Sequence, residues 1–307
     1  PDFTWTGDGT PDVTDFYDPL SWSPNGVPGG NATLLFPDVT NQLVTLDSDY
    51  DAGNLLFDAP DTYTLDSTPD SVTIFSFELT QAGAGDVIFD LPVEFSANHV
   101  LEGDGAGEVV FKQPVDMGGT HAWDKSGTFT LVFEASNPFD PRQFNVREGT
   151  ILFREDGTML DNSGQYQYTI GAGGLAGPVK DTEPTYLILD DTSVNLTDRL
   201  QDAKNVDLGR GDTHFRLISN GAADSEETVN NLASNLTTGG YVEIVNTSPT
   251  TRSRLFFNAK ANHRNIVVFS TDATAQFGQP GISGFGPRVI FDTDPTQITD
   301  ASGDSII

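Results

Sequence analysis

Residues 87–153 repeat one short motif, two aliphatic residues followed by phenylalanine: Val87-Ile88-Phe89, Val109-Val110-Phe111, Leu131-Val132-Phe133 and Ile151-Leu152-Phe153. The phenylalanines follow one another at steps of 22, 22 and 20 residues. One coil of a β-solenoid uses about 20 to 25 residues, because each circuit is a few short strands joined by tight corners. We therefore expect these segments to stack coil on coil, with the phenylalanine rings forming a dry ladder along the axis.

The same motif occurs on both sides of this stretch, at residues 34–36, 55–57, 267–269 and 289–291. Phe36 and Phe57 are 21 residues apart, Phe57 and Phe89 are 32 apart, and Phe269 and Phe291 are 22 apart. We expect the step of 32 to hold an extra strand, Val72 to Leu79. A repeat of about 22 residues therefore extends over most of the chain.

Short β-rich runs fill the intervals between the motifs, and clusters of Gly, Asn and Asp separate them. Only residues 224–236 have apolar residues at helical spacing, and the Asn and Gly around them favour no more than a turn or two. The sequence thus predicts an all-β chain, a parallel β-helix with about 22 residues per coil. An antiparallel β-sandwich is the alternative, because its strands carry similar runs.

The composition limits the partners of this chain. Its 45 acidic and 15 basic residues give a formal charge of -30, which repels a phosphate backbone or an anionic bilayer. We expect no nucleic-acid partner and no membrane insertion, since no run approaches the roughly 20 apolar residues of a span. The absence of cysteine excludes a disulfide framework and thiol chemistry.

Three stretches in the middle of the chain share Gly-Thr corners and an Asn-x-aromatic turn: Ser126-Gly127-Thr128-Phe129-Thr130-Leu131, Asn137-Pro138-Phe139 and Phe144-Asn145-Val146-Arg147-Glu148-Gly149-Thr150-Ile151-Leu152. They resemble the autotransporter-associated β-strand repeat, although Asp140-Pro141 stands where the repeat has a Gly-Gly corner. The N-terminal residues Trp5-Thr6-Gly7, Asp18-Pro19-Leu20-Ser21-Trp22 and Pro28-Gly29-Gly30 are similar to the opening of exported proteins that carry these repeats.

The resemblance implies a right-handed β-helix of the autotransporter passenger type, secreted and displayed at a bacterial cell surface. On this basis we expect residues 1–36 to form an N-terminal cap and first coil, and residues 37–307 to form the β-helix. Because Ser305-Ile306-Ile307 follows a turn-like segment, we also expect the parent protein to continue beyond this point. The expected function is a structural or adhesive scaffold, which associates with itself into a fibre or binds surface glycans or proteins.

Parallel β-helices also include polysaccharide-degrading enzymes and phage tail-spikes, which remain the alternative functions. Of the motif set of pectinase-like enzymes, only the pair Asp190-Asp191 is present, and such a pair is more often a solvated strand end. The four histidines, His99, His121, His214 and His263, lack metal-type spacing and are expected to pack at coil edges. We therefore expect no catalytic residues and no enzyme activity.

Calcium is the ligand that the sequence motivates best, although no cofactor is expected to be required. Asp47, Asp49 and Asp51 lie at alternate positions of one loop, with Asp58 nearby as a further oxygen donor. A structural Ca²⁺ at these four residues is thus a prediction, with an ordinary acidic corner as the alternative.

The three tryptophans could stack on sugar rings if they were exposed. We instead expect Trp5 and Trp22 to close the first coil, because a solenoid needs a cover over its open end.

Overall fold

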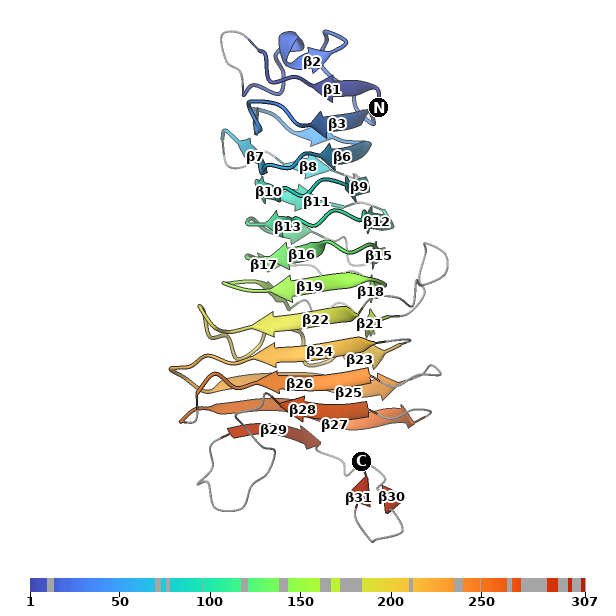
Figure 1. Cartoon of the computed structure of the whole chain (residues 1–307), viewed down its shortest axis with the longest axis vertical. Coiled ribbons are helices and arrows are strands. Elements are labelled where there is room, and N and C mark those ends of the chain that lie inside the picture. Colours follow the sequence, from blue (N-terminus) through green and yellow to red (C-terminus); the bar gives the residue numbers. More distant parts are fainter. Residues whose placement is uncertain are drawn as a thin grey trace.

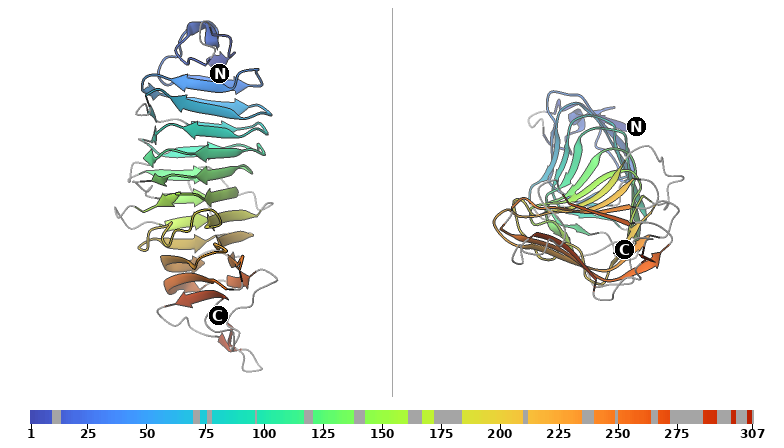
Figure 2. Two further views of the ribbon diagram at one scale, coloured as in Figure 1. Left: turned by 90° about the vertical axis from the view of Figure 1, so that its left-hand side faces the viewer. Right: turned by 60° about the horizontal axis from the view of Figure 1, so that its bottom comes forward.

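The chain forms one elongated stack of β-coils (Figures 1 and 2). The computed structural model describes residues 1–9, 14–69, 73–75, 78–95, 97–116, 121–137, 143–160, 167–171, 184–209, 212–234, 240–248, 250–263, 267–271, 286–291, 298–299 and 305–306. The first residues lie at one end of the stack and later coils follow in sequence order toward the other end. Within the described ranges, no helix has the length and apolar character needed to cross a bilayer.

The longest sheet, sheet A, joins thirteen of the described strands. In spatial order they are β2 (Trp22–Ser23), β1 (Phe3–Trp5), β3 (Thr33–Pro37), β6 (Asn54–Asp58), β9 (Glu78–Gln81), β12 (His99–Glu102), β15 (Ala122–Lys125), β18 (Gln143–Val146), β21 (Gln167–Ile170), β23 (Asn205–Leu208), β25 (Ser225–Ser234), β27 (Arg252–His263) and β29 (Gly286–Phe291).

Two further sheets complete the circuit of each coil. Sheet B contains β4 (Leu43–Leu46), β7 (Tyr63–Ser67), β10 (Val87–Asp90), β13 (Glu108–Phe111), β16 (Thr130–Phe133), β19 (Gly149–Phe153), β22 (Thr185–Asp190), β24 (Thr213–Ile218), β26 (Gly240–Val245) and β28 (Val267–Thr271). Sheet C contains β5 (Tyr50–Asp51), β8 (Ile74–Phe75), β11 (Val93–Glu94) and β14 (Val115–Asp116), and the pair β17 (Ser136–Asn137) and β20 (Thr158–Met159) follows.

The predicted right-handed parallel β-helix is confirmed. Apart from β1 with β2, all strand pairs given above are parallel, and each strand pairs with the strand of the next coil rather than with its neighbour in sequence. From β3 to β14 successive strands run A, B, C and then A again, and from β21 to β29 the described strands alternate between A and B, so the chain winds rather than folding back. The antiparallel sandwich is therefore wrong.

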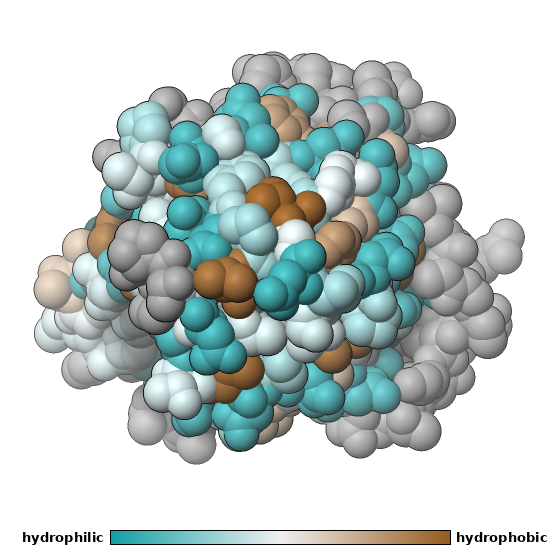
Figure 3. All heavy atoms as spheres, turned by 90° about the horizontal axis from the view of Figure 1, so that it is seen from above, coloured by the Kyte–Doolittle hydropathy of each residue, from teal (hydrophilic) through white to brown (hydrophobic). Residues whose placement is uncertain are grey.

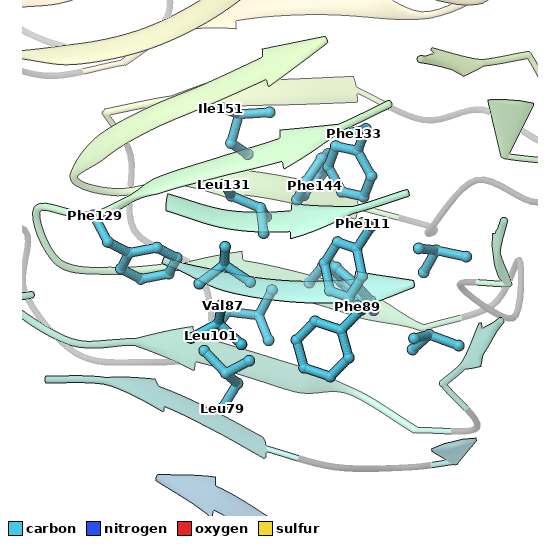
Figure 4. Close-up of a cluster of buried hydrophobic side chains, with 14 of the residues drawn as sticks. Leu79, Val87, Phe89, Leu101, Phe111, Phe129, Leu131, Phe133, Phe144 and Ile151 are labelled. Atoms are coloured by element: carbon cyan, nitrogen blue, oxygen red, sulfur yellow. The ribbon is translucent and has the colours of Figure 1, made fainter. Parts of the chain in front are cut away.

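The Phe motif decides which side chains face inward. Phe89, Phe111, Phe133 and Phe153 pair directly across sheet B, and each is at most 1% exposed. Their rings stack at centroid distances of 5.0, 5.6 and 5.2 Å. Figure 4 shows the rings of Phe89, Phe111 and Phe133 one above another. Because side chains alternate across a strand, the aliphatic residue before each phenylalanine points outward and the one before that points inward.

The step of 32 residues has a different cause from the one expected. Phe36 and Phe57 belong to sheet A, whereas Phe89 belongs to sheet B, so the motif changes sheets between them. The rings still touch, since Phe57 meets Phe89 edge to face at 6.3 Å. The predicted extra strand at 72–79 is two strands, β8 and β9, which lie in sheets C and A. Val72 lies outside the described residues.

The coils lengthen toward the C-terminal end. Thr185 pairs with Thr213 and His214 with Tyr241, so these coils take 28 and 27 residues instead of about 22. Phe291 pairs with Phe257 in sheet A, while Phe269 lies in sheet B. The expectation that Phe269 and Phe291 mark one repeat is therefore wrong.

Residues 225–234 form strand β25, although their apolar spacing suggested a short helix. Ser225, Glu227 and Val229 alternate inward as in any strand, and the next inward residue is Leu232, three positions later. The backbone N–H of Asn230 donates to the carbonyl of Lys204 in the preceding coil, which marks the corner that shifts the pattern. A bend between two stretches of strand thus imitates helical spacing.

Strands β1 and β2 lie at the N-terminal end of the stack. Trp5 and Trp22 are fully buried with ring centroids 5.1 Å apart, and Phe16 packs on Trp22 at 5.1 Å. A short 3₁₀ helix, η1 (Pro19–Ser21), leads into β2, which pairs antiparallel with β1 and covers it. Figure 3 views this end and shows separate hydrophobic side chains among hydrophilic ones. The predicted closure by Trp5 and Trp22 is confirmed.

A small hairpin lies at the other end. β30 (Ile298–Thr299) pairs antiparallel with β31 (Ser305–Ile306), so this segment does not stack on a coil as a further parallel strand.

Candidate functional site

A column of charged side chains follows one corner of the helix, where sheet B ends. Because Phe111, Phe133 and Phe153 are in register, the residues after them also stack in the order Lys112, Glu134 and Arg154. The Nε atom of Arg154 lies 2.8 Å from Oε1 of Glu134, and its Nη2 atom lies 3.0 Å from Oε2 of Glu108. The corner is thus held by partly exposed ion pairs that run from coil to coil.

Arg199 fixes the next loop of this corner, residues 191–200. It is 1% exposed, and its Nε donates to Oδ1 of Asp191 at 2.7 Å. Its two terminal nitrogens donate to four backbone carbonyls at 2.7 to 3.0 Å, those of Glu155, Gly157, Asp190 and Val194. One guanidinium therefore ties the loop to its own strand and to the preceding coil.

Two buried carboxylates complete this arrangement. Burial raises the pKa of Asp191, although the hydrogen bond and charge of Arg199 oppose the shift. Glu227 accepts hydrogen bonds from the backbone N–H groups of Arg199 and Leu200 at 2.8 and 3.2 Å. Burial also raises the pKa of Glu227 well above its ordinary value. The backbone at 199–200 is thus held from the inside of the solenoid.

A groove with a volume of about 610 Å³ lies between this loop and the charged column. Its apolar lining consists of Ala135, Leu160 and Leu196. Its polar lining consists of Lys112, Glu134, Ser136, Asp156, Thr158, Thr197 and Asp198. The side chains come from four successive coils, since Lys112, Glu134, Asp156 and Asp198 follow strands β13, β16, β19 and β22. This volume is within the range of sites that hold a small ligand.

Asp198 is the titratable group of the groove whose environment is most unusual. Burial raises its pKa to about 6, and the nearby charge of Asp202 adds to the shift. Such a group in a cleft is a candidate for a binding or catalytic role. The groove combines carboxylates, hydroxyls, one ammonium group and an apolar floor, so it can accept hydrogen bonds from a polar ligand while covering that ligand's apolar face.

The predicted calcium ligands lie at three different corners of the helix. Asp47 and Asp49 follow β4 at the corner between sheets B and C, Asp51 ends β5, and Asp58 ends β6 at the corner between sheets A and B. Asp49 accepts the backbone N–H of Thr73 at 2.9 Å. Within the described part of the chain, no three carboxylate or imidazole side chains converge in a way that could hold a metal ion.

Calcium binding by these residues stays a prediction. If they hold Ca²⁺, a chelator lowers the thermal unfolding midpoint, and Asp47→Asn with Asp49→Asn removes that effect. An unchanged midpoint contradicts it.

The solvent exposure of the Asp190-Asp191 pair and of Trp123 tests what the sequence suggests for these residues. Asp190 is partly exposed, but Asp191 is fully buried against Arg199, so a solvated strand end is wrong for Asp191. Trp123 is fully buried in the core, so it cannot stack on a sugar. The side chain of His263 lies outside the described residues.

His214 lies in a stacked ladder on the outer face of sheet B. Its ring packs between those of Tyr186 and Tyr241 at centroid distances of 4.5 and 4.6 Å. Its two ring nitrogens lie 2.7 Å from Asp212 and 3.0 Å from Glu243. His99 is buried against Phe95. Both positions agree with a packing role.

The sequence does not predict the groove, because its lining residues are spread over 86 positions, from Lys112 to Asp198, and form no motif. One feature of the sequence does indicate a loop there: the segment after Asp190 is long and contains Leu196-Thr197-Asp198 but no Phe motif. Comparisons with models of known protein families, with curated proteins and with solved structures find no match for this chain.

Proposed function

We propose that this protein is a structural and adhesive scaffold, exported to a bacterial cell surface or secreted, and that it catalyses no reaction. The observation that carries the proposal is the single core that runs through the stack from the Trp5–Trp22 closure to Phe257. A continuous parallel β-helix is stiff because each coil bonds to both neighbours along its length. When one end of such a rod is attached to a surface, its flanks stay at a fixed distance from that surface.

The surface chemistry supports an exposed setting for this rod. The charge of -30 keeps copies apart at low salt and favours solubility. The outer faces carry ion pairs such as Arg154 with Glu134 and Arg216 with Glu243, which fasten neighbouring coils to one another. This arrangement leaves the flanks available for contact with other molecules.

Self-association into a fibre is part of the proposal, and the N-terminal cap restricts how it could occur. The short antiparallel strand β2 and the buried tryptophans cover the first coil, so the edge of β1 is not free to continue the parallel stack. If copies add end to end, the contact involves the other end of the rod, and a fibre needs a second contact on a flank.

Small-angle scattering and sedimentation velocity on the full chain test this function. Thirteen described strands of sheet A, spaced about 4.8 Å apart, give a rod roughly 60 Å long. We expect an elongated particle whose sedimentation coefficient rises with protein concentration. A strictly monomeric rod at high concentration, with calcium included, contradicts the fibre but leaves adhesion intact.

Two results contradict the scaffold proposal as a whole. A stable trimer at all concentrations favours the tail-spike alternative. Release of reducing ends from a panel of polysaccharides favours the degrading enzyme instead.

A further inference from the structure

We propose that the groove formed by residues 112, 134–136, 156, 158, 160 and 196–198 binds an oligosaccharide that carries hydroxyl or amino groups but no acid group. This inference deepens the proposed adhesive role and rests on it, because it names the chemistry that the flank of the rod recognises.

The floor of the groove suits one face of a sugar ring. Leu160 is 37% exposed, which is unusual for a large aliphatic side chain on this molecule, and Leu196 and Ala135 line the same cavity. Sugar rings present patches of C–H groups on one face, and an apolar floor covers such patches favourably. Binding sites for small ligands commonly combine an apolar lining with a few placed polar groups.

The rim of the groove suits the hydroxyl and amino groups of a sugar. Glu134, Asp156 and Asp198 accept hydrogen bonds, while Ser136, Thr158 and Thr197 can donate or accept them. The hydroxyl of Thr158 already donates to that of Ser136 at 2.9 Å, which orients both groups. Hydrogen bonds to an ionised carboxylate are stronger than those between neutral groups.

The charge of the groove selects among sugars. Asp156 and Asp198 face one ammonium group, Lys112, while Glu134 is paired with Arg154, and the whole chain is strongly acidic. A uronic acid or a sulfated sugar is therefore repelled, whereas a neutral or amino sugar is not. Asp198 is exposed at the rim of the groove, and partial desolvation with the charge of Asp202 raises its pKa to about 6. Its carboxylate can accept hydrogen bonds from a ligand hydroxyl or ammonium group.

The wall of the groove is fixed before a ligand arrives. Leu196, Thr197 and Asp198 immediately precede Arg199, whose side chain holds five acceptors across two coils. A wall held in place loses little conformational freedom on binding, which favours affinity.

Isothermal titration calorimetry on the full chain tests the proposal with four soluble probes: cello-oligosaccharides, N-acetylglucosamine oligomers, glucosamine oligomers and oligogalacturonate. We expect saturable binding of at least one of the first three and none of the acidic probe. The groove variant Asp156→Asn with Asp198→Asn should weaken that binding about tenfold or more, because each change removes a charged acceptor. Leu160→Arg, which fills the floor, should weaken it similarly.

The matched control is Asp38→Asn with Asp61→Asn, which changes the net charge equally at exposed positions of another corner. This variant should bind as the wild type does, and all three variants should keep the wild-type unfolding midpoint within a few degrees. Equal loss of binding in groove and control variants means non-specific charge attraction and overturns the proposal. Binding of none of the first three probes, or of oligogalacturonate alone, overturns it too. These outcomes leave the shape and association tests of the scaffold unaffected.

Discussion

Lys125 places an ammonium group in the core of the solenoid. It pairs with Leu101 on one side and Val146 on the other, so it occupies a position that is aliphatic in the neighbouring coils. Its Nζ donates to the carbonyl of Glu148 at 2.8 Å and to that of Gly127, and lies 4.0 Å from the centroid of the Phe129 ring. Burial lowers the pKa of Lys125 to about 7, although the charges of Glu148 and Asp104 oppose this.

This shift predicts how stability depends on pH. Below pH 7 the ammonium group of Lys125 is charged in both the folded and the unfolded chain, so the cost of burying that charge lowers the free energy of unfolding in full. Between pH 7 and about 10.5 only the unfolded chain holds the proton, so the free energy of unfolding rises with pH. Relative to Lys125→Met, the wild type should gain up to about 1.4 kcal/mol per pH unit in this range, measured by urea unfolding.

The exposed residue Lys112 provides the control, because Lys112→Met should leave the pH dependence of the wild type unchanged. If the free energy of unfolding changes with pH in the same way for the wild type and for Lys125→Met, the pKa of Lys125 is not lowered.

Arg199 and Asp191 predict a strong coupling between two buried residues. Arg199→Met should cost about 3 to 5 kcal/mol of unfolding free energy, because it leaves the Asp191 carboxylate buried without its cation and frees four carbonyls. The double variant Arg199→Met with Asp191→Leu should recover part of that loss. A double-mutant cycle by urea unfolding measures the coupling, and simple additivity of the two changes argues against the pair.

At this scale the groove could hardly be predicted from the sequence. Arg199 resembles any other basic residue in the printed sequence, and only the structure reveals that it is buried. Asp198 became a candidate because the loop that carries it packs beside Asp156 and Glu134. Sequence spacing cannot report such a contact between coils.

At the scale of the element, the corners between sheets A and B depend on glycine. Gly127 has φ +94°, and a Cβ atom on it would overlap the carbonyl oxygen of Gly103 in the preceding coil. Gly103 has φ +133° and is related in the same way to Gln81. Both the backbone conformation and the spacing of the coils therefore exclude a side chain at these corners.

Gly127→Ala should destabilise the fold by about 2 kcal/mol or more, from backbone strain and from separation of two coils. Gly29→Ala is the matched control, because a Cβ atom on Gly29 would meet nothing within 4 Å, and it should change stability by less than about 0.5 kcal/mol. Thermal or urea unfolding compares the two. Equal effects at both positions contradict tight stacking at this corner.

The Phe motif shows why the elements were predictable in one region only. From Phe89 to Phe153 each coil has the same three short strands, so spacing in sequence equals spacing in the structure. Before Phe89 the motif moves to the other sheet, and after Phe153 the coils lengthen. The ring pattern alone does not distinguish sheets, because an inward phenylalanine fills the same core from either one.

At the scale of the whole molecule, the charge of -30 sets the response to salt. Repulsion among surface carboxylates opposes the compact state and is screened as the Debye length falls from about 30 Å at 0.01 M to about 3 Å at 1 M. The thermal unfolding midpoint should therefore rise by several degrees between low and high sodium chloride. A midpoint that falls with salt means that ion pairs such as Arg154 with Glu134 outweigh the repulsion.

The central claim is that the coils stack in register along one axis, and distances between spin labels test it most directly. The chain has no cysteine, so pairs of cysteines that carry the labels can be introduced at Asp90, Ile218 and Val245. These three positions lie in one column of sheet B. Ile218 is five coils from Asp90 and Val245 is six coils from it. Double electron-electron resonance should therefore give a distance of roughly 24 Å for the pair 90 and 218 and roughly 29 Å for the pair 90 and 245. The 27 further residues add only one coil spacing of about 4.8 Å. Distances that do not increase coil by coil contradict the solenoid, and with it the scaffold that depends on it.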